Sequence, residues 1–79
     1  MDLKQTALKK SLELGVMTPT ITDYAREKEG ERGFFVDMKG ANLNLSKSVH
    51  AAIQQQAIES NERVWTRLFP GRIQVYWKR

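Results

Sequence analysis

The chain contains no cysteine and only one histidine, His50. Disulfide bonds and Cys/His metal sites, which commonly stabilise small domains, are therefore excluded. With 79 residues the chain must build one small hydrophobic core, because chains divide into several domains only at much greater length. Its hydrophobic content of 41% is ordinary for a globular protein. We therefore expect a single domain over residues 1–79, held together by side-chain packing alone.

Charge is distributed unevenly along the chain. Residues 1–62 contain eight basic and nine acidic side chains, which nearly cancel. Residues 63–79 contain five basic side chains and no acidic one: Arg63, Arg67, Arg72, Lys78 and Arg79. A concentrated positive patch attracts polyanions more strongly than the same charge spread over a whole surface. We call residues 63–79 the basic C-terminal arm and expect it to bind something negative.

Neither a membrane span nor a signal peptide is predicted. A helix that crosses a bilayer needs about 20 consecutive apolar residues, whereas even the longest apolar runs here are only a few residues, such as Phe34-Phe35-Val36. The lysines near the N-terminus are not followed by an apolar run, as a signal peptide would require. We expect no membrane partner and a cytoplasmic location.

Residues 2–14 are expected to form a helix. Asp2 is a suitable N-cap, and Leu3, Ala7 and Leu14 lie near one angle of the helix. Gly15 can adopt the positive φ that commonly ends a helix.

Residues 16–32 allow two interpretations. In the first, Thr18 begins a second helix that carries Pro19 in its first turn and runs to Gly30. The good helix formers from Ala25 to Glu29 favour this interpretation. In the second, residues 20–25 form a strand and residues 27–32 a hairpin loop, because Thr, Ile and Tyr favour strands.

The remainder of the chain predicts a strand, a long helix and a final strand. Residues 33–39 alternate between apolar and polar side chains, as a strand does. The helix that follows has a line of residues at steps of three and four. The line consists of the apolar residues Val49, Ile53, Ala57, Val64 and Leu68, with Ser60 between Ala57 and Val64.

Pro70-Gly71 is a turn signal that ends this helix. Residues 72–78 then alternate again, with Ile73, Val75 and Trp77 on one face. The expected fold is α+β, with an N-terminal helix and a small antiparallel sheet packed against one long helix.

The segment from Leu14 to Tyr24 resembles the centre of the helix-turn-helix in DNA-binding proteins of the phage repressor and Cro type, and the resemblance covers residues 7–26. Gly15 fits the turn, where positive φ is needed. The apolar positions of the motif are matched by Val16, Ile21 and Tyr24, and the small residue at the helix crossing by Ser11.

The resemblance implies that a helix after Gly15 reads the major groove of DNA as part of a homodimer. The implied contacts to bases come from Met17, Thr18, Pro19, Thr20, Thr22, Asp23 and Arg26. Lys9 and the cations of the basic C-terminal arm would hold phosphates.

Cations in the arm alternate with aromatic residues: Trp65, Phe69, Tyr76 and Trp77. Arginine binds phosphate bidentately, and exposed rings stack on unpaired bases. The alternative is that the aromatic residues belong to the core and the arginines to a solvated rim. Tryptophan and tyrosine beside arginine are also typical of protein-binding hot spots. The candidates for a partner-binding site are Trp65, Tyr76 and Trp77.

Catalysis is not predicted. His50 is isolated beside an apolar helix face, and Glu27, Glu29 and Glu31 alternate with basic residues as on a solvated surface. The sequence has no glycine-rich phosphate loop and no metal-ligand spacing. We therefore expect a protein that is not an enzyme and that uses no cofactor and no metal.

Two functions remain. The first is a small DNA-binding regulator of phage or plasmid type. The second is a protein-binding inhibitor or adaptor that occupies an acidic or nucleic-acid-binding surface of a larger partner.

Overall fold

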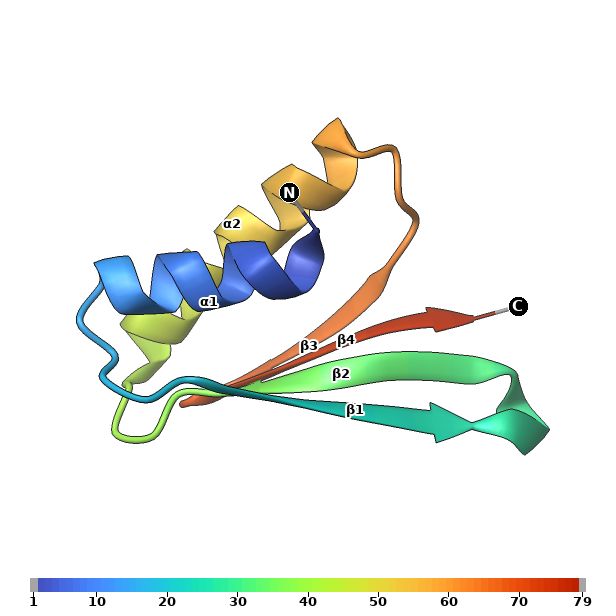
Figure 1. Ribbon diagram of the computed structural model, residues 1–79, viewed down its shortest axis with the longest axis horizontal. Helices are drawn as coiled ribbons and strands as arrows, with labels where there is room; N and C mark the ends of the chain where they lie inside the picture. The colour runs from blue at the N-terminus through green and yellow to red at the C-terminus, as the bar shows by residue number, and fades with distance from the viewer. Residues whose placement is uncertain (1, 79) are drawn as a thin grey trace.

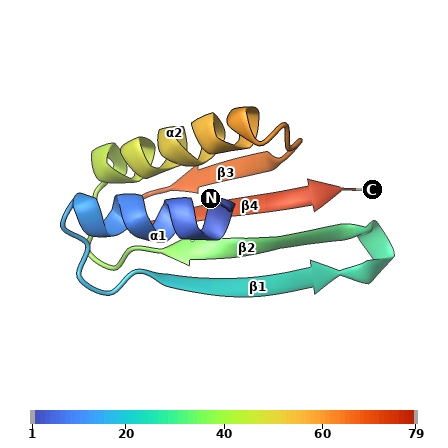
Figure 2. The same cartoon turned by 45° about the horizontal axis from the view of Figure 1, so that its top comes forward.

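The computed structural model describes residues 2–78 and consists of one sheet covered by helices on one face (Figures 1 and 2). The elements in chain order are α1 (Leu3–Glu13), β1 (Thr20–Arg26), the 3-10 turn η1 (Glu27–Glu29), β2 (Glu31–Asp37), α2 (Leu43–Glu59), β3 (Trp65–Phe69) and β4 (Arg72–Lys78). The strands are antiparallel in the order β1-β2-β4-β3. Both the α+β class and the packing of a long helix on a small antiparallel sheet are confirmed.

The predicted first helix is confirmed, together with both of its ends. The Asp2 side chain accepts a hydrogen bond from the Gln5 N–H at 2.7 Å. In the reverse direction, the Gln5 side-chain oxygen accepts one from the Asp2 N–H at 3.4 Å. Gly15, at φ 93°, follows the last turn, and Val16 donates back to the Ser11 carbonyl at 2.9 Å. This cap directs the buried Val16 side chain into the core.

The second helix predicted for residues 18–30 is wrong, and the strand interpretation of this segment is confirmed. Residues 20–26 form β1, which pairs with β2 from Thr20 opposite Asp37 to Arg26 opposite Glu31. The pairing with β2 gives the backbone of this segment its hydrogen-bond partners, and the β-branched and aromatic side chains of β1 suit the strand conformation. A helix-turn-helix needs a helix directly after Gly15, and the structure has a loop and β1 at this position.

The long helix ends earlier than predicted. Asn61 has a φ of 53°, and Glu62 donates to the Ala57 carbonyl at 2.8 Å, so the backbone leaves the helix after Glu59. The residues expected in the last helical turns form β3 instead, and Pro70-Gly71 is the turn between β3 and β4. The prediction failed because Val64 and Leu68 fit a helical step of four and a strand alternation equally well.

The predicted strands around the core are confirmed, with the first of them displaced by two residues to Glu31–Asp37. Their alternate side chains point to the helices, and these include Phe34 and Val36 of β2 and Ile73 and Val75 of β4. The helices contribute Leu3, Ala7, Val49, Ile53 and Ala57 to the same cluster.

The β3–β4 turn is fixed to the start of α2. Gly71 donates its N–H to the hydroxyl of Ser46 at 2.8 Å, and its carbonyl accepts from Met38 N–H at 2.8 Å. Ser46 is fully buried. Residues 65–78 of the basic C-terminal arm therefore form an integral hairpin of the sheet rather than an extended tail. Within residues 2–78, neither helix has the length and apolar character needed to cross a membrane.

Candidate functional site

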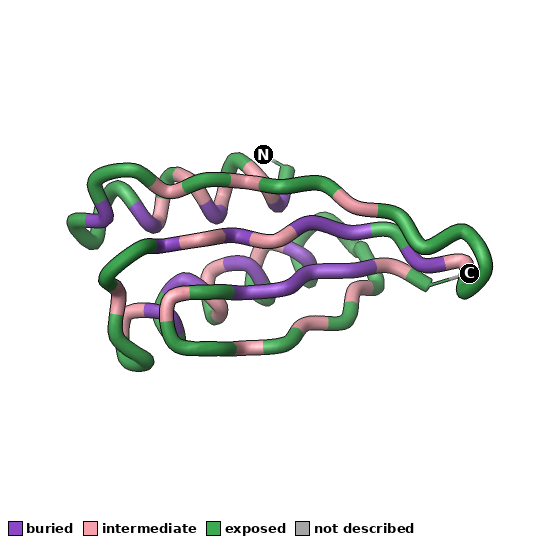
Figure 3. Tube along the Cα trace, turned by 90° about the horizontal axis from the view of Figure 1, so that it is seen from below, coloured by how far each residue is buried: buried purple, intermediate pink, exposed green. Residues whose placement is uncertain are grey.

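One face of the sheet has no helix over it, and we call it the open face. Figure 3 views the molecule from this side. Strand alternation and the pairing register place five aromatic side chains on this face: Tyr24, Phe35, Trp65, Phe69 and Tyr76. The same reasoning places four cations there: Arg26, Arg67, Arg72 and Lys78. Every strand therefore contributes to the open face an aromatic ring, a cation or both.

The aromatic rings of the open face form two pairs across neighbouring strands. Trp65 and Tyr76 are stacked, with centroids 6.2 Å apart and planes inclined by 20°. Tyr24 and Phe35 lie 5.0 Å apart at 33°. Such pairs stabilise a sheet across its strands, so each pair has a defined position on the face.

Cations lie over these rings. The Arg72 guanidinium is 4.2 Å from the centroid of Phe35, and that of Arg67 is 5.6 Å from the centroid of Tyr76. Lys78 lies on Tyr76 at the same distance, 5.6 Å. Cation–π contacts at these distances are attractive. They hold each of these cations against an aromatic ring of the open face.

Both carboxylates of the open face lie on β2 and are engaged within the protein. The Asp37 carboxylate forms an ion pair with Arg72, at 3.0 Å from its Nε. Glu31 is buried, accepts from the Tyr24 hydroxyl at 3.1 Å and lies 3.9 Å from Arg26 Nη1. Gln74 donates to the Tyr24 hydroxyl at 2.6 Å. Burial is the largest cause of the raised pKa of Tyr24, so the phenol keeps its proton in this network.

Positive charge and exposed aromatic surface coincide on the side of the open face formed by β3 and β4. Trp65 is 41% exposed and Phe69 45% exposed, and Arg67 lies between them on the same strand. Among residues 2–78, no carboxylate lies within 4.0 Å of the charged groups of Arg67 and Lys78. We call Trp65, Arg67, Phe69, Arg72, Tyr76 and Lys78 the β3–β4 patch.

The residues predicted to contact DNA do not form one site. The open face receives Thr20, Thr22 and Arg26 from β1, and Arg67, Arg72 and Lys78 from the hairpin. Asp23 points to the helix side, where Lys4 Nζ lies 2.6 Å from its carboxylate. The remaining predicted residues lie elsewhere: Met17, Thr18 and Pro19 in the loop before β1, Lys9 on α1 and Arg63 before β3. Arg79 lies outside the described residues.

The partner-binding set also divides between the two faces. Trp65 and Tyr76 are stacked on the open face, whereas Trp77 points to the helix side and lies 6.0 Å from Phe34 of the core. Trp77 is partly buried at the margin of the core, and its role in partner binding stays a prediction. The sequence-based prediction missed Tyr24 and Phe35, which reach the open face only through the pairing of β1 with β2 and β4.

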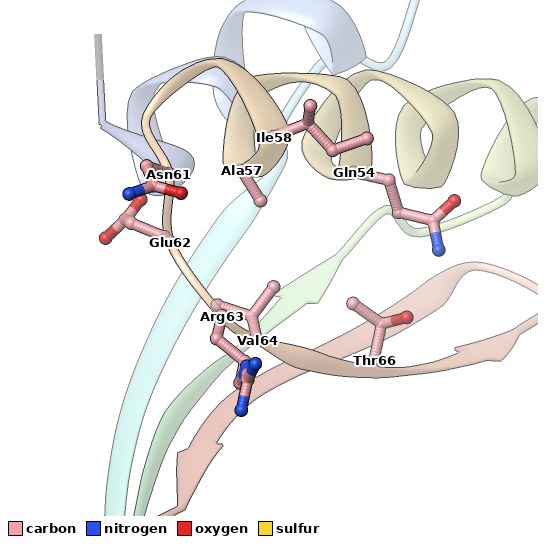
Figure 4. Close-up of a pocket in the computed structure, with 8 residues that line it drawn as sticks. All are labelled: Gln54, Ala57, Ile58, Asn61, Glu62, Arg63, Val64 and Thr66. Atoms are coloured by element: carbon pink, nitrogen blue, oxygen red, sulfur yellow. The ribbon is translucent and has the colours of Figure 1, made fainter.

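A pocket of about 810 Å³ lies between the end of α2 and the start of β3. Its walls include Ile58 and Ala57 from α2, and Val64 and Thr66 from the β3 side (Figure 4). Nearby, His50 Nε2 is 2.7 Å from the Thr66 hydroxyl, and burial lowers the pKa of His50. The groups needed to hold a metal are not gathered anywhere in residues 2–78.

The chain matches no protein-family model, and no curated protein and no solved structure is significantly similar to it.

Proposed function

We propose that the chain binds single-stranded nucleic acid on the β3–β4 patch. The observation that carries the proposal is the order of side chains along β3. Two exposed aromatic rings, Trp65 and Phe69, flank a cation, Arg67, that has no carboxylate partner among the described residues. A nucleic-acid strand offers the complementary groups, because its bases are flat rings joined by phosphates.

Strand geometry gives these side chains a suitable spacing. Residues two apart on a strand point to the same face about 7 Å from each other. A base that stacks on an exposed aromatic ring contributes about 1–3 kcal/mol, whichever base it is. Arginine supplies several N–H donors in a planar fork that matches a phosphate. Trp65 and Phe69 are thus about 14 Å apart, with Arg67 between them. Arg67 is suited to a phosphate in the stretch of backbone that joins two bases resting on these rings.

Two features favour a single strand over a duplex. The adenine edge of a base pair is read mainly by asparagine and glutamine. On the open face the amide side chain is Gln74, which is 5% exposed and donates to Tyr24. In addition, four strands at a spacing of about 4.8 Å span about 14 Å before side chains are added, which exceeds the major-groove width of about 12 Å.

Salt dependence of binding tests the proposal. Each phosphate neutralised on a single strand contributes about −0.7 to the slope of log K against log salt. Removing two phosphate contacts by Arg67→Gln with Lys78→Gln is expected to reduce the steepness of that slope by about 1.4. Fluorescence anisotropy of a labelled single-stranded oligonucleotide, as DNA and as RNA, measures the slope.

The matched control is the pair Lys9→Gln and Lys47→Gln, which removes the same charge from exposed positions on the two helices. This control is expected to leave the slope almost unchanged. Equal loss of slope in both double variants would show that net charge, and not the β3–β4 patch, determines binding. No binding of DNA or RNA at low salt would overturn the proposal and favour a protein partner, since tryptophan, tyrosine and arginine also dominate protein hot spots.

A further inference from the structure

The two edge strands of the sheet differ in their protection against pairing with another chain. Edge strands are commonly protected by proline, by lysine or by a charged side chain that points inward. The edge strand β1 has such a charge, because Asp23 points to the helix side and pairs with Lys4. On β3, the side chains that point inward are Thr66 and Leu68, both uncharged. Only β1 is therefore protected in this way.

Apolar surface is also exposed on both sides of the β3 edge. Trp65 and Phe69 are exposed on the open face, and Ile58, which is 73% exposed, borders the pocket on the helix side. Exposed apolar side chains that cluster along an unprotected edge mark an interaction site. Figure 3 places β3 along one border of the sheet, where no further strand follows.

The backbone of β3 is oriented for further pairing. The hairpin turns through the two residues Pro70 and Gly71, so Phe69 and Arg72 form the hydrogen-bonded pair that closes it. Along an antiparallel strand, alternate residues direct their N–H and C=O groups to opposite neighbours. Thr66 and Leu68 therefore direct theirs away from β4, toward the outer edge.

We propose that β3 pairs antiparallel with β3 of a second copy of this chain, centred on Thr66. In this register Thr66 lies opposite the partner's Thr66, and Trp65 lies opposite the partner's Arg67. Leu68 then faces the partner's Val64, and Phe69 faces the partner's Arg63. Two-fold symmetry repeats each pairing, so the edge is complementary to itself in both apolar and cation–π contacts.

The neighbouring registers are less favourable. Centring the pair on Arg67 places two guanidinium groups directly opposite each other, and like charges in that position destabilise a sheet. Centring it on Leu68 brings Pro70 opposite Thr66, and proline has no N–H to donate to the ladder. The register centred on Thr66 avoids both defects.

The dimer would have one continuous eight-stranded sheet with the two β3 strands in its middle. The open faces of the two copies would join, and both β3–β4 patches would lie side by side at the centre. A ligand that binds one patch could then continue onto the second without leaving the sheet. Pairing of the chains does not itself require nucleic acid, so it can be tested separately.

Disulfide cross-linking tests the register directly, because the chain has no cysteine of its own. Opposed residues of a hydrogen-bonded antiparallel pair have Cα atoms about 5.5 Å apart, within the range that a disulfide spans. A Thr66→Cys variant in a glutathione redox buffer is expected to form a covalent dimer as the main species. The control Thr22→Cys, an exposed threonine on β1, is expected to form no covalent dimer.

Sedimentation equilibrium of the unmodified chain is expected to give twice the mass of one chain. Thr66→Pro removes the N–H that points to the outer edge, together with the hydroxyl 2.7 Å from His50 Nε2. It is expected to give a single-chain mass with an unchanged circular dichroism spectrum. A single-chain mass for the unmodified protein would overturn the proposal, whatever the folding of the proline variant. Equal cross-linking of Thr66→Cys and Thr22→Cys, or stronger cross-linking of Arg67→Cys, would overturn the pairing centred on Thr66.

Discussion

A chain with both Trp65→Ala and Phe69→Ala is expected to bind a single-stranded oligonucleotide about 30-fold or more weakly than the unmodified chain. Each lost stacking contact costs about 1–3 kcal/mol, and 1.4 kcal/mol corresponds to a factor of ten in affinity. Both side chains are more than 40% exposed and lie outside the core cluster, so the fold is expected to persist. Anisotropy titration at one fixed salt concentration measures the loss.

The control for this variant is the pair Leu12→Ala and Met17→Ala. These side chains are also large, apolar and exposed, but they lie on α1 and in the loop that follows it. Their removal is expected to leave the affinity unchanged. Sedimentation of the Trp65/Phe69 variant separates lost stacking from lost pairing of the chains. A loss of affinity below threefold, with the fold intact, would show that these two rings do not stack on bases.

Gly33→Ala is expected to destabilise the protein by about 3 kcal/mol or more, which approaches the whole stability of a domain of this size. Gly33 lies on β2, in register with Tyr24 on one side and Tyr76 on the other. A Cβ at this position would meet the Val75 carbonyl and would lie 2.8 Å from Tyr76 Cβ. These are atoms of the neighbouring strand near its backbone, so relief requires movement of β4. Urea denaturation followed by circular dichroism measures the change.

Gly40→Ala is the matched comparison for Gly33→Ala. Gly40 has a φ of 85°, and a Cβ there would have no neighbour within 4 Å. Its cost is therefore the backbone strain of a left-handed residue, about 1–2 kcal/mol. If Gly33→Ala destabilised the protein no more than Gly40→Ala, the close approach of β2 and β4 would not be what excludes a side chain at position 33.

Local signals predicted the parts of the fold that depend on local interactions. The cap at Asp2, the helix end at Gly15 and the alternation of residues 72–78 each involve groups within a few residues of one another. The same alternation already placed Trp77 with the core residues Ile73 and Val75. Trp77 was included in the partner-binding set because of the composition of the arm, and composition does not show on which face of the sheet a side chain lies.

The conformation of residues 20–26 could not be predicted from nearby residues alone, because strand β1 depends on pairing with β2 and on the position of α1. The end of α2 had a local signal in Asn61, whose side-chain type tolerates the left-handed region. The open face combines side chains from all four strands, and their assembly depends on the strand order. A linear sequence indicates that aromatic and cationic residues are present, but it does not give the order in which strands bring them together.

The chain has two tryptophans, one on each face of the sheet, and their separate emission tests the central claim most directly. In a Trp77→Phe chain, only Trp65 emits, and a single-stranded oligonucleotide at low salt is expected to quench it because a base stacks on the indole. In a Trp65→Phe chain, the emission of Trp77 on the helix side is expected to stay constant during the same titration. Binding that leaves Trp65 unquenched, or that changes the emission of Trp77 instead, would contradict a nucleic-acid site on the open face.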